Sequence, residues 1–343
     1  MRRHLVLFVG LAVLCLMGVG VIKTALGVLE PVVSRPDPLV PPPIRLMEIE
    51  EGTTLRQLAA RLEQEHLIRS RWGFLLLGKL AWADRRVQAG EYALHAGMRP
   101  GDILADVLNG RVHLHTVTIP EGFTVAQMAE TLAQAGLVDQ HEFLTLANDR
   151  DFIRTLGLNV ASLEGYLFPN TYRFAKHMKA KDVLQTLVAA LWQSFTPELR
   201  ARARDINMTL HQVLTLASVI EKETSVPAER ELISAVFHNR LKRRIPLQSD
   251  PTVIYALSNF DGNIRKRDLS VKSPYNTYKV RGLPPGPIAS PGAGSIEAAL
   301  YPASVPYLYF VSRNDGTHHF SSSLAEHNKA VAKYQRRVRR RHA

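Results

Sequence analysis

The sequence has very little cysteine. One cysteine occurs among 343 residues, so an internal disulfide framework and a zinc site built from cysteines are both excluded. A chain of this length can bury a full hydrophobic core without such cross-links. Because it is more than twice as long as a typical domain of ~150 residues, we expect two or three domains.

The signatures of several enzyme classes are missing as well. The sequence contains neither G-x-S-x-G nor S-x-x-K, which removes the usual signatures of serine hydrolases and penicillin-binding enzymes. His141-Glu142 is not completed to the H-E-x-x-H of zinc proteases. In GFLLLGKL, from Gly73, Leu80 stands where a P-loop needs a Mg²⁺-binding serine or threonine, so this segment is predicted to be a core helix.

Acidic residues are outnumbered, and the 43 lysines and arginines against 31 acids give a net charge of +12. Six of the positive groups lie in the last eleven residues, most of them in an Arg-rich tail, 336–343. Such a tail can contact phosphates or anionic lipid headgroups, although a solvated chain end is the commoner case. The distribution therefore does not predict a nucleic-acid-binding protein.

Long apolar runs are absent except at the amino terminus. The run from Leu5 to Ile22 has eighteen residues without a charge, just enough to cross ~30 Å of hydrocarbon. Arg2 and Arg3 precede it, which places the first residues in the cytoplasm. We therefore predict a cytoplasmic stub (1–4) and an uncleaved transmembrane helix (5–28), with a proline-rich spacer (29–44) after it.

Two stretches after the spacer share one pattern of strand, glycine turn and amphipathic helix. The first starts at Ile44 and predicts a helix N-cap at Thr53 or Thr54, and the second starts at His115 and predicts one at Thr124. The first unit, 45–114, is predicted to be a β-α-α-β module that resembles the glycan-binding LysM fold. The second, 115–207, is predicted to be another α+β unit, with a short hairpin at 162–174 and a helix at 181–195.

The most informative stretch is TLHQVLTLASVIEKETS, from Thr209. Thr209 and Gln212 predict a capping box, and the apolar residues after them predict a helix with one wide apolar face. Glu221 and Glu223 lie at the two margins of that face, near the negative end of the helix, where ionisation of a carboxyl is disfavoured. A carboxylic acid that is protonated near neutral pH can cleave a glycosidic bond. Without further motifs, the same pattern is more often explained by two solvent-exposed glutamates at a helix end.

The following loops are rich in proline, glycine, tyrosine, asparagine and glutamine, which is typical of a polar cleft for a sugar polymer. Seven motifs follow one another along the chain: EGYLFPNTY, LASVIEKET, VFHNRL, LQSDPTVIY, SPYNTY, GLPPGPI and PYLYFV. Together, in this order, they make the chain similar to the bacterial endolytic murein transglycosylases, the MltG (YceG-like) family. The resemblance runs from the anchor to about Lys333.

The resemblance implies an enzyme, a lyase that cuts MurNAc-β-1,4-GlcNAc bonds inside nascent peptidoglycan strands and leaves 1,6-anhydroMurNAc ends. Such cleavage would terminate glycan elongation. The catalytic residue would be Glu221, acting first as general acid and then as general base, and no metal or organic cofactor would be needed. The implied place is the bacterial inner membrane, with one span and the bulk of the chain in the periplasm. Peptidoglycan synthases, penicillin-binding proteins and division proteins are the implied partners.

The catalytic domain is predicted to cover 208–335, so the expected fold is α+β behind a single N-terminal membrane helix. Substrate contacts are expected from polar and aromatic residues in the matching motifs: Glu223, Asn239, Gln248, Asp250, Tyr275, Asn276 and Tyr278. A loop-stabilising role fits the last five equally well, and Glu223 could instead tune Glu221 or cap the helix. Two other hypotheses remain, namely a non-enzymatic glycan-binding scaffold and an anionic-lipid or nucleic-acid binder acting through the tail.

Overall fold

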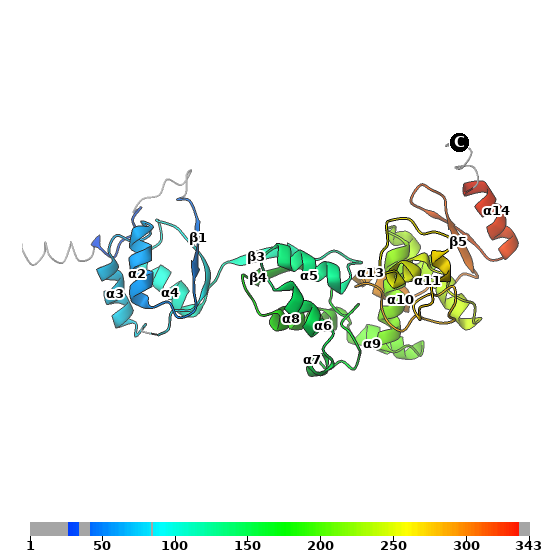
Figure 1. Cartoon of the computed structure of the whole chain (residues 1–343), viewed down its shortest axis with the longest axis horizontal. Coiled ribbons are helices and arrows are strands. Elements are labelled where there is room, and N and C mark those ends of the chain that lie inside the picture. The colour runs from blue at the N-terminus through cyan, green and yellow to red at the C-terminus, as the bar shows by residue number, and fades with distance from the viewer. Residues whose placement is uncertain (1–26, 34–41, 84, 336–343) are drawn as a thin grey trace, which may run out of the picture. The chain divides into compact units, whose positions relative to one another are not determined.

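The computed structural model describes residues 27–33, 42–83 and 85–335. Within these ranges no helix is long and apolar enough to cross a membrane. The predicted transmembrane segment, 5–28, lies outside the described residues apart from its last two, and the basic tail, 336–343, lies outside them altogether. The predicted mixed α+β architecture is confirmed (Figure 1).

The chain forms two compact units. The first contains the residues up to His115 together with Arg173–His177, and the second contains Thr116–Tyr172 and the chain from Met178 onward. The finer predicted division at residue 208, inside the second unit, stays a prediction.

The first unit has a two-stranded antiparallel sheet, in which Met47 pairs with Tyr92 and Ile49 with Gly90. The helices between and after the strands cover the face that carries the buried side chains of Met47 and Tyr92 (Figure 1). The elements in chain order are β1 (Arg45–Ile49), α2 (Leu55–Gln64), α3 (Arg71–Leu80), β2 (Gly90–Leu94) and α4 (Pro100–Asn109). The rejected P-loop segment is a helix, α3, as predicted. The elements through β2 run β-α-α-β and α4 follows them, while the LysM-like character of the unit stays a prediction.

The second unit is mainly helical, and its strands β5 and β6 pair as a hairpin. The strands β3 and β4 also pair, although more than fifty residues separate them, and each has residues in both units. From β3 to α9 the elements are β3 (Leu114–Thr118), α5 (Val125–Gln134), α6 (Gln140–Ala147), α7 (Arg150–Thr155), β4 (Thr171–Ala175), α8 (Ala180–Ser194) and α9 (Pro197–Asp205). The rest of the second unit contains α10 (Leu210–Glu223), the 3₁₀ turn η1 (Pro227–Glu229), α11 (Arg230–Lys242), α12 (Asp250–Ala256), the 3₁₀ turn η2 (Asp268–Ser270), α13 (Ala293–Leu300), β5 (Tyr309–Ser312), β6 (His318–Ser321) and α14 (Leu324–Tyr334).

The predicted starts of helices α2, α5 and α10 are confirmed. Thr54, Thr124 and Thr209 each complete a capping box with the glutamine three residues later. The predicted helix at 181–195 is present as α8, one residue earlier at each end.

The predicted hairpin at 162–174 is wrong. Only the last part of that segment is a strand, β4, and it pairs with β3 rather than with the residues just before it. The preceding residues form turns whose aromatic groups are buried: Tyr166 is 2% exposed, and its hydroxyl lies 2.8 Å from His211 Nδ1. Alternating aromatics here reflect packing on both sides of a turn, not a two-stranded ladder.

Helix α10 is buried on all sides, whereas the sequence predicted one apolar face. Every residue from Val213 to Ile220 is buried, because α9, α11, α12 and α13 pack around the helix. The two hydroxyls in this stretch bond within the helix, Thr215 to the His211 carbonyl at 2.6 Å and Ser218 to the Thr215 carbonyl at 2.7 Å. Glu221 and Glu223 follow where the helix leaves this enclosure.

Candidate active site

Glu221 is held by a backbone amide and an arginine. The Gly292 N–H donates to Glu221 Oε2 at 3.0 Å, and Arg230 Nη2 lies 3.7 Å from Glu221 Oε1. The Glu221 side chain is 8% exposed. Gly292 is the N-cap residue of α13, so the carboxylate also lies at the positive end of that helix. Each of these contacts stabilises negative charge on Glu221.

Two glycines make room for this arrangement. A Cβ atom at Gly292 would overlap the carboxyl group of Glu121, and one at Gly294 would overlap Arg230 Nη1. Arg230 also lies 3.4 Å from Glu121 Oε2, so one guanidinium faces two carboxylates. Three segments that are far apart in the sequence, around residues 121, 221–230 and 292–294, therefore meet at Glu221.

Glu223 lies on the other flank of α10 and lines a cavity of about 240 Å³. The Ser249 hydroxyl donates to Glu223 Oε1 at 2.5 Å. The other lining residues come from α11, the segment before and within α12, and the carboxyl-terminal elements: Arg240, Leu247, Gln248, Asp250, Tyr278, Phe310 and His327.

Burial raises the pKa of Glu223 to about 7, and the charge of Asp250 acts in the same direction. The Ser249 hydrogen bond and the Arg240 guanidinium oppose this shift but do not cancel it. Near neutral pH, Glu223 is therefore a carboxyl group that binds and releases a proton.

A third carboxyl group, Glu164, shares this property. Burial raises the pKa of Glu164 to about 7, against hydrogen bonds from the backbone and from Tyr255. The Val125 N–H donates to both of its oxygens, at 3.2 and 3.4 Å, which ties Glu164 to the start of α5. Tyr275 packs against Tyr255 with a ring separation of 4.9 Å.

The structure brings four of the expected substrate-binding residues together. Glu223, Gln248, Asp250 and Tyr278 line the one cavity, and the Tyr278 hydroxyl donates to Asp250 Oδ1 at 2.6 Å. Their contact with sugar stays a prediction.

The other expected residues lie elsewhere. Asn239 donates to the carbonyls of Val305 and Tyr307, both at 2.9 Å. Asn276 is fully buried and donates to two backbone carbonyls of the preceding loop. Tyr275 packs against Tyr255, which hydrogen-bonds to Glu164. For the two asparagines the observed contacts are loop-stabilising.

Sequence reasoning missed Arg230, Gly292 and Arg240. Arg240 is buried and donates to the carbonyls of Leu308 and Leu247, each at 2.7 Å. It follows Asn239 directly in VFHNRL, so its position in a matching motif was the available signal. Nothing local in the sequence marks Arg230 or Gly292 as neighbours of Glu221.

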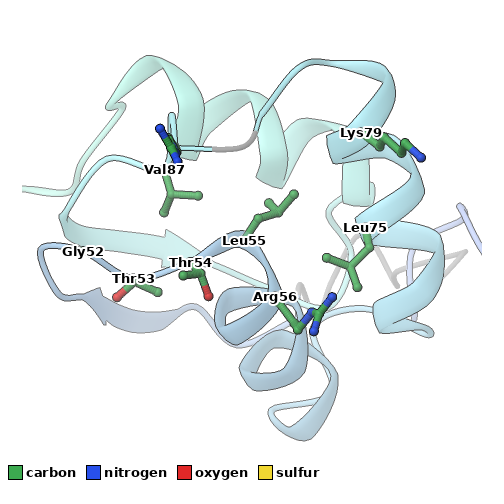
Figure 2. A pocket seen from close by; sticks show the side chains of 9 residues that line it. Gly52, Thr53, Thr54, Leu55, Arg56, Leu75, Lys79 and Val87 are labelled. Atoms are coloured by element: carbon green, nitrogen blue, oxygen red, sulfur yellow. The ribbon is translucent and has the colours of Figure 1, made fainter.

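The first unit has a separate cavity of about 590 Å³. It lies between the β1–α2 turn, at Gly52–Arg56, and α3, with Val87 on another side (Figure 2). Arg85 also lines it. Threonine hydroxyls and the cations of Arg56, Lys79 and Arg85 line it. Such a surface suits a polar ligand with negative groups.

Comparisons with known proteins agree with the motifs. The model of the YceG-like family matches residues 47–333. A Bacillus subtilis (strain 168) protein named endolytic murein transglycosylase is 34% identical over 304 residues, which cover 84% of each chain. A Streptococcus pneumoniae (strain D39) protein of the same name is 30% identical over 319 residues, covering 83% of this chain and 57% of its own length.

A solved structure of a similar protein has a similar fold. The crystal structure of a YceG-like protein from Listeria monocytogenes matches with a TM-score of 0.59 and 34% identity. The match covers 83% of this chain and 98% of that chain.

Proposed function

The chain belongs to the YceG-like family, and we propose that it is an endolytic murein transglycosylase, an enzyme that cleaves peptidoglycan glycan strands internally. The observation that carries this proposal is the similarity to a relative of that name over 84% of both chains. The geometry around Glu221 supports it with a carboxylate held in place by groups that stabilise its charge.

In the proposed reaction, the protonated carboxyl of Glu221 gives its proton to the oxygen that joins C1 of MurNAc to GlcNAc, and the bond from C1 to that oxygen breaks. The C6 hydroxyl oxygen of the same MurNAc bonds to C1 and closes a 1,6-anhydro ring. The hydroxyl proton passes to the Glu221 carboxylate and restores its starting state. No water is consumed, and the nucleophile belongs to the substrate, so the paired carboxylates of ordinary glycosidases are not required.

The surroundings of Glu221 support the carboxylate state that lies between the two proton transfers. Between the two proton transfers the residue is a carboxylate, and the Gly292 N–H and the Arg230 guanidinium stabilise that state without moving. Substrate that covers the site would exclude water and strengthen these interactions further.

The test uses the full chain in detergent with purified peptidoglycan, and mass spectrometry of the products. We expect new 1,6-anhydro ends inside long strands. Glu221→Gln should abolish them, and the exposed Glu142→Gln on α6 serves as the matched control. Glu223→Gln should retain cleavage.

Other outcomes point elsewhere. Reducing ends in place of anhydro ends would mean a hydrolase. Loss of cleavage in Glu223→Gln alone would move the catalytic role to that residue. Binding without cleavage by any variant would favour the scaffold hypothesis. Activity that depends on residues 336–343 but not on Glu221 would favour the lipid or nucleic-acid binder.

The first unit is proposed to hold the glycan strand as a LysM-like module, in the cavity of Figure 2. Its cations suit the lactyl and peptide carboxylates of peptidoglycan. Arg56→Ala and Arg85→Ala should each weaken binding of labelled strands several-fold. The exposed Arg313→Ala is the control, and equal binding by all three variants would reject this cavity.

The proposed location is the inner membrane, with one span (5–28) and the described units in the periplasm. This proposal rests on the apolar run after Arg2 and Arg3. Peptidoglycan synthases and division proteins stay expected partners. Protease digestion of intact spheroplasts tests the orientation, since the described units should be cut only from the periplasmic side.

A further inference from the structure

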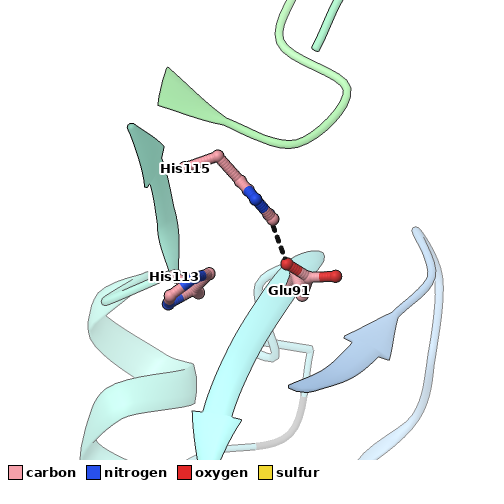
Figure 3. Close-up of side chains that lie close together, drawn as sticks. All are labelled: Glu91, His113 and His115. Carbon is pink, nitrogen blue, oxygen red and sulfur yellow. Dashed lines mark hydrogen bonds and ion pairs between the residues drawn. The ribbon is translucent and has the colours of Figure 1, made fainter. Parts of the chain in front are cut away.

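We propose that Glu91, His113 and His115 bind one divalent transition-metal ion, with zinc as the preferred ion. This site lies within the first unit, takes no part in the glycan chemistry and does not depend on the proposed function. The possible ligand atoms of the three side chains all lie within 4.8 Å of one another (Figure 3).

Strand geometry places the three side chains together. His113 and His115 are two residues apart in an extended segment, so their side chains project to the same side. Their rings meet edge to face with centroids 4.9 Å apart. The His113 N–H donates to the Glu91 carbonyl at 2.6 Å, which fixes this segment beside β2.

The donor set matches a zinc site with an open position. Two imidazoles and one carboxylate are the ligands of several catalytic zinc sites, with bond lengths of about 2.0–2.2 Å. His115 Nε2 now lies 2.5 Å from Glu91 Oε2, in an ion pair or hydrogen bond. A shared tetrahedral ion would require these atoms to be about 3.3 Å apart. The His115 side chain is 30% exposed and has room to turn by this amount.

Neighbouring charges orient the carboxylate. Lys176 Nζ lies 3.4 Å from Glu91 Oε1, and the same ammonium lies 3.4 Å from Glu48 Oε2. Glu91 Oε1 is therefore occupied, while Oε2 faces the histidines, as a ligand with a supporting partner would be arranged.

The surroundings are also acidic. A cavity of about 360 Å³ beside the cluster is lined by Glu48, Glu50, Glu51 and Glu91, against one lysine and one histidine. This excess of negative charge raises the local concentration of cations.

The test is calorimetric titration of the untagged, chelator-treated full chain in detergent with ZnCl₂, repeated with Co²⁺ for its coordination-sensitive absorption. We expect one equivalent to bind with micromolar or tighter affinity. His113→Ala, His115→Ala and Glu91→Gln should each weaken binding at least tenfold. The exposed His141→Ala, on α6, is the matched control.

Two results would overturn the metal site. One is a parent chain that binds zinc no more tightly than the His113→Ala/His115→Ala double variant. The other is a Co²⁺ spectrum that is unchanged by that double variant. In either case the cluster is only an ion-pair network between Glu91, His115 and Lys176.

A different observation carries a second inference: we infer that an exposed apolar surface on α3 rests in the headgroup region of a lipid bilayer. Trp72, Leu76 and Leu80 recur every four residues along α3 and are 57–71% exposed, and Trp82 just beyond is 84% exposed. Large apolar groups in such a stripe are rarely left in water.

The chain itself indicates what covers this surface. Val28, the last residue of the predicted membrane span, and Leu29, just after it, lie against Gly73, which follows Trp72 in α3. Arg69 Nε donates to the Pro31 carbonyl at 3.0 Å, which holds the same segment beside α3. If residues 5–28 cross the membrane, the stripe lies at its surface.

The chemistry of the stripe suits that position. Tryptophan is enriched at the level of lipid headgroups, and exposed basic residues beside it attract anionic lipids. Arg71, whose guanidinium lies 5.1 Å from the centre of the Trp72 ring, provides such a positive group.

This inference rests on the proposed membrane anchor, so the test separates the two. The full chain is reconstituted in vesicles of phosphatidylethanolamine and phosphatidylglycerol with brominated acyl chains, and flotation and tryptophan quenching are measured. We expect the chain to float and its fluorescence to be quenched, and we expect Trp72→Phe/Trp82→Phe, which retains only Trp192, to lose most of the quenching.

Flotation with equal quenching in that variant and in the parent would overturn the membrane surface and leave the anchor intact. A chain that does not float would overturn both. Leu76→Gln/Leu80→Gln should reduce quenching without affecting flotation, because it removes the apolar contact and keeps the span.

Discussion

The raised pKa of Glu223 makes folding stability depend on pH in a way that one substitution can reveal. In the folded protein this pKa is about 7, against an ordinary value of 4.5. Between these two pH values the folded state binds more protons than the unfolded state, so the free energy of unfolding falls as pH rises. Above about pH 7 both states are ionised and no further change is expected from this group.

The magnitude follows from the two pKa values. Each pKa unit corresponds to about 1.4 kcal/mol. Relative to low pH, where both states are protonated, the shifted pKa of Glu223 lowers the free energy of unfolding by about 3 kcal/mol at pH 8 and by about 1 kcal/mol or less at pH 5. Glu223→Gln has no charge to bury and keeps Oε1 as the acceptor for the Ser249 hydroxyl. The variant should therefore be more stable than the parent by up to about 3 kcal/mol at pH 8, with most of the gain lost at pH 5.

The assay is urea unfolding at both pH values, followed by Trp192 fluorescence in a Trp72→Phe/Trp82→Phe background, so that only the second unit is observed. Glu142→Gln should show no such pH dependence. Glu223→Ala should be less stable than Glu223→Gln at both pH values by about 1–3 kcal/mol, because it leaves the Ser249 hydroxyl without its partner. A stability difference between Glu223→Gln and the parent that is the same at pH 5 and pH 8 would refute the reasoning.

Three further substitutions probe other contacts. Gly292→Ala should lower the cleavage rate at least tenfold with unchanged circular dichroism, because its methyl group displaces the Glu121 carboxyl beside Glu221, the proposed catalytic residue. Full activity would contradict the proposed site. Arg240→Met should destabilise the second unit by about 3 kcal/mol or more in urea unfolding, since backbone carbonyls lose their donor. Gly78→Ala should lower the free energy of unfolding of the first unit by about 1–3 kcal/mol, because the added methyl overlaps buried Leu55. A lower melting temperature of that unit alone would show it.

Features that depend on a few neighbouring residues could be predicted from the sequence. The capping boxes at Thr54, Thr124 and Thr209 need only a threonine and a glutamine three residues apart. The helix at α8 follows from one amphipathic run. The gathering of Gln248, Asp250 and Tyr278 in one cavity was expected only because their motifs belong together in a family.

Features that depend on long-range packing could not be predicted in this way. Strand β4 pairs with β3, more than fifty residues away, and alternation in the sequence cannot distinguish that partner from a nearer one. The contacts of Glu221 with Arg230 and Gly292 arise from the folding of α11 and α13 around α10. The spacing of apolar residues predicted one buried face for α10, whereas the helix is buried on all sides. That spacing cannot show how many other helices pack around it.

The two glutamates at the end of α10 have different polar partners, and this bears on which one the proposed reaction would use. Burial favours the protonated form of Glu223, whereas an amide and a guanidinium stabilise the carboxylate of Glu221. Residues two apart on a helix point to different sides, so the two carboxyls do not face one bond together. A group that acts as acid and then as base must be stabilised in the state between the two transfers, which is the carboxylate. The surroundings of Glu221 meet that requirement and so support its proposed catalytic role, while protonation of Glu223 keeps a buried carboxyl group neutral in the neighbouring cavity.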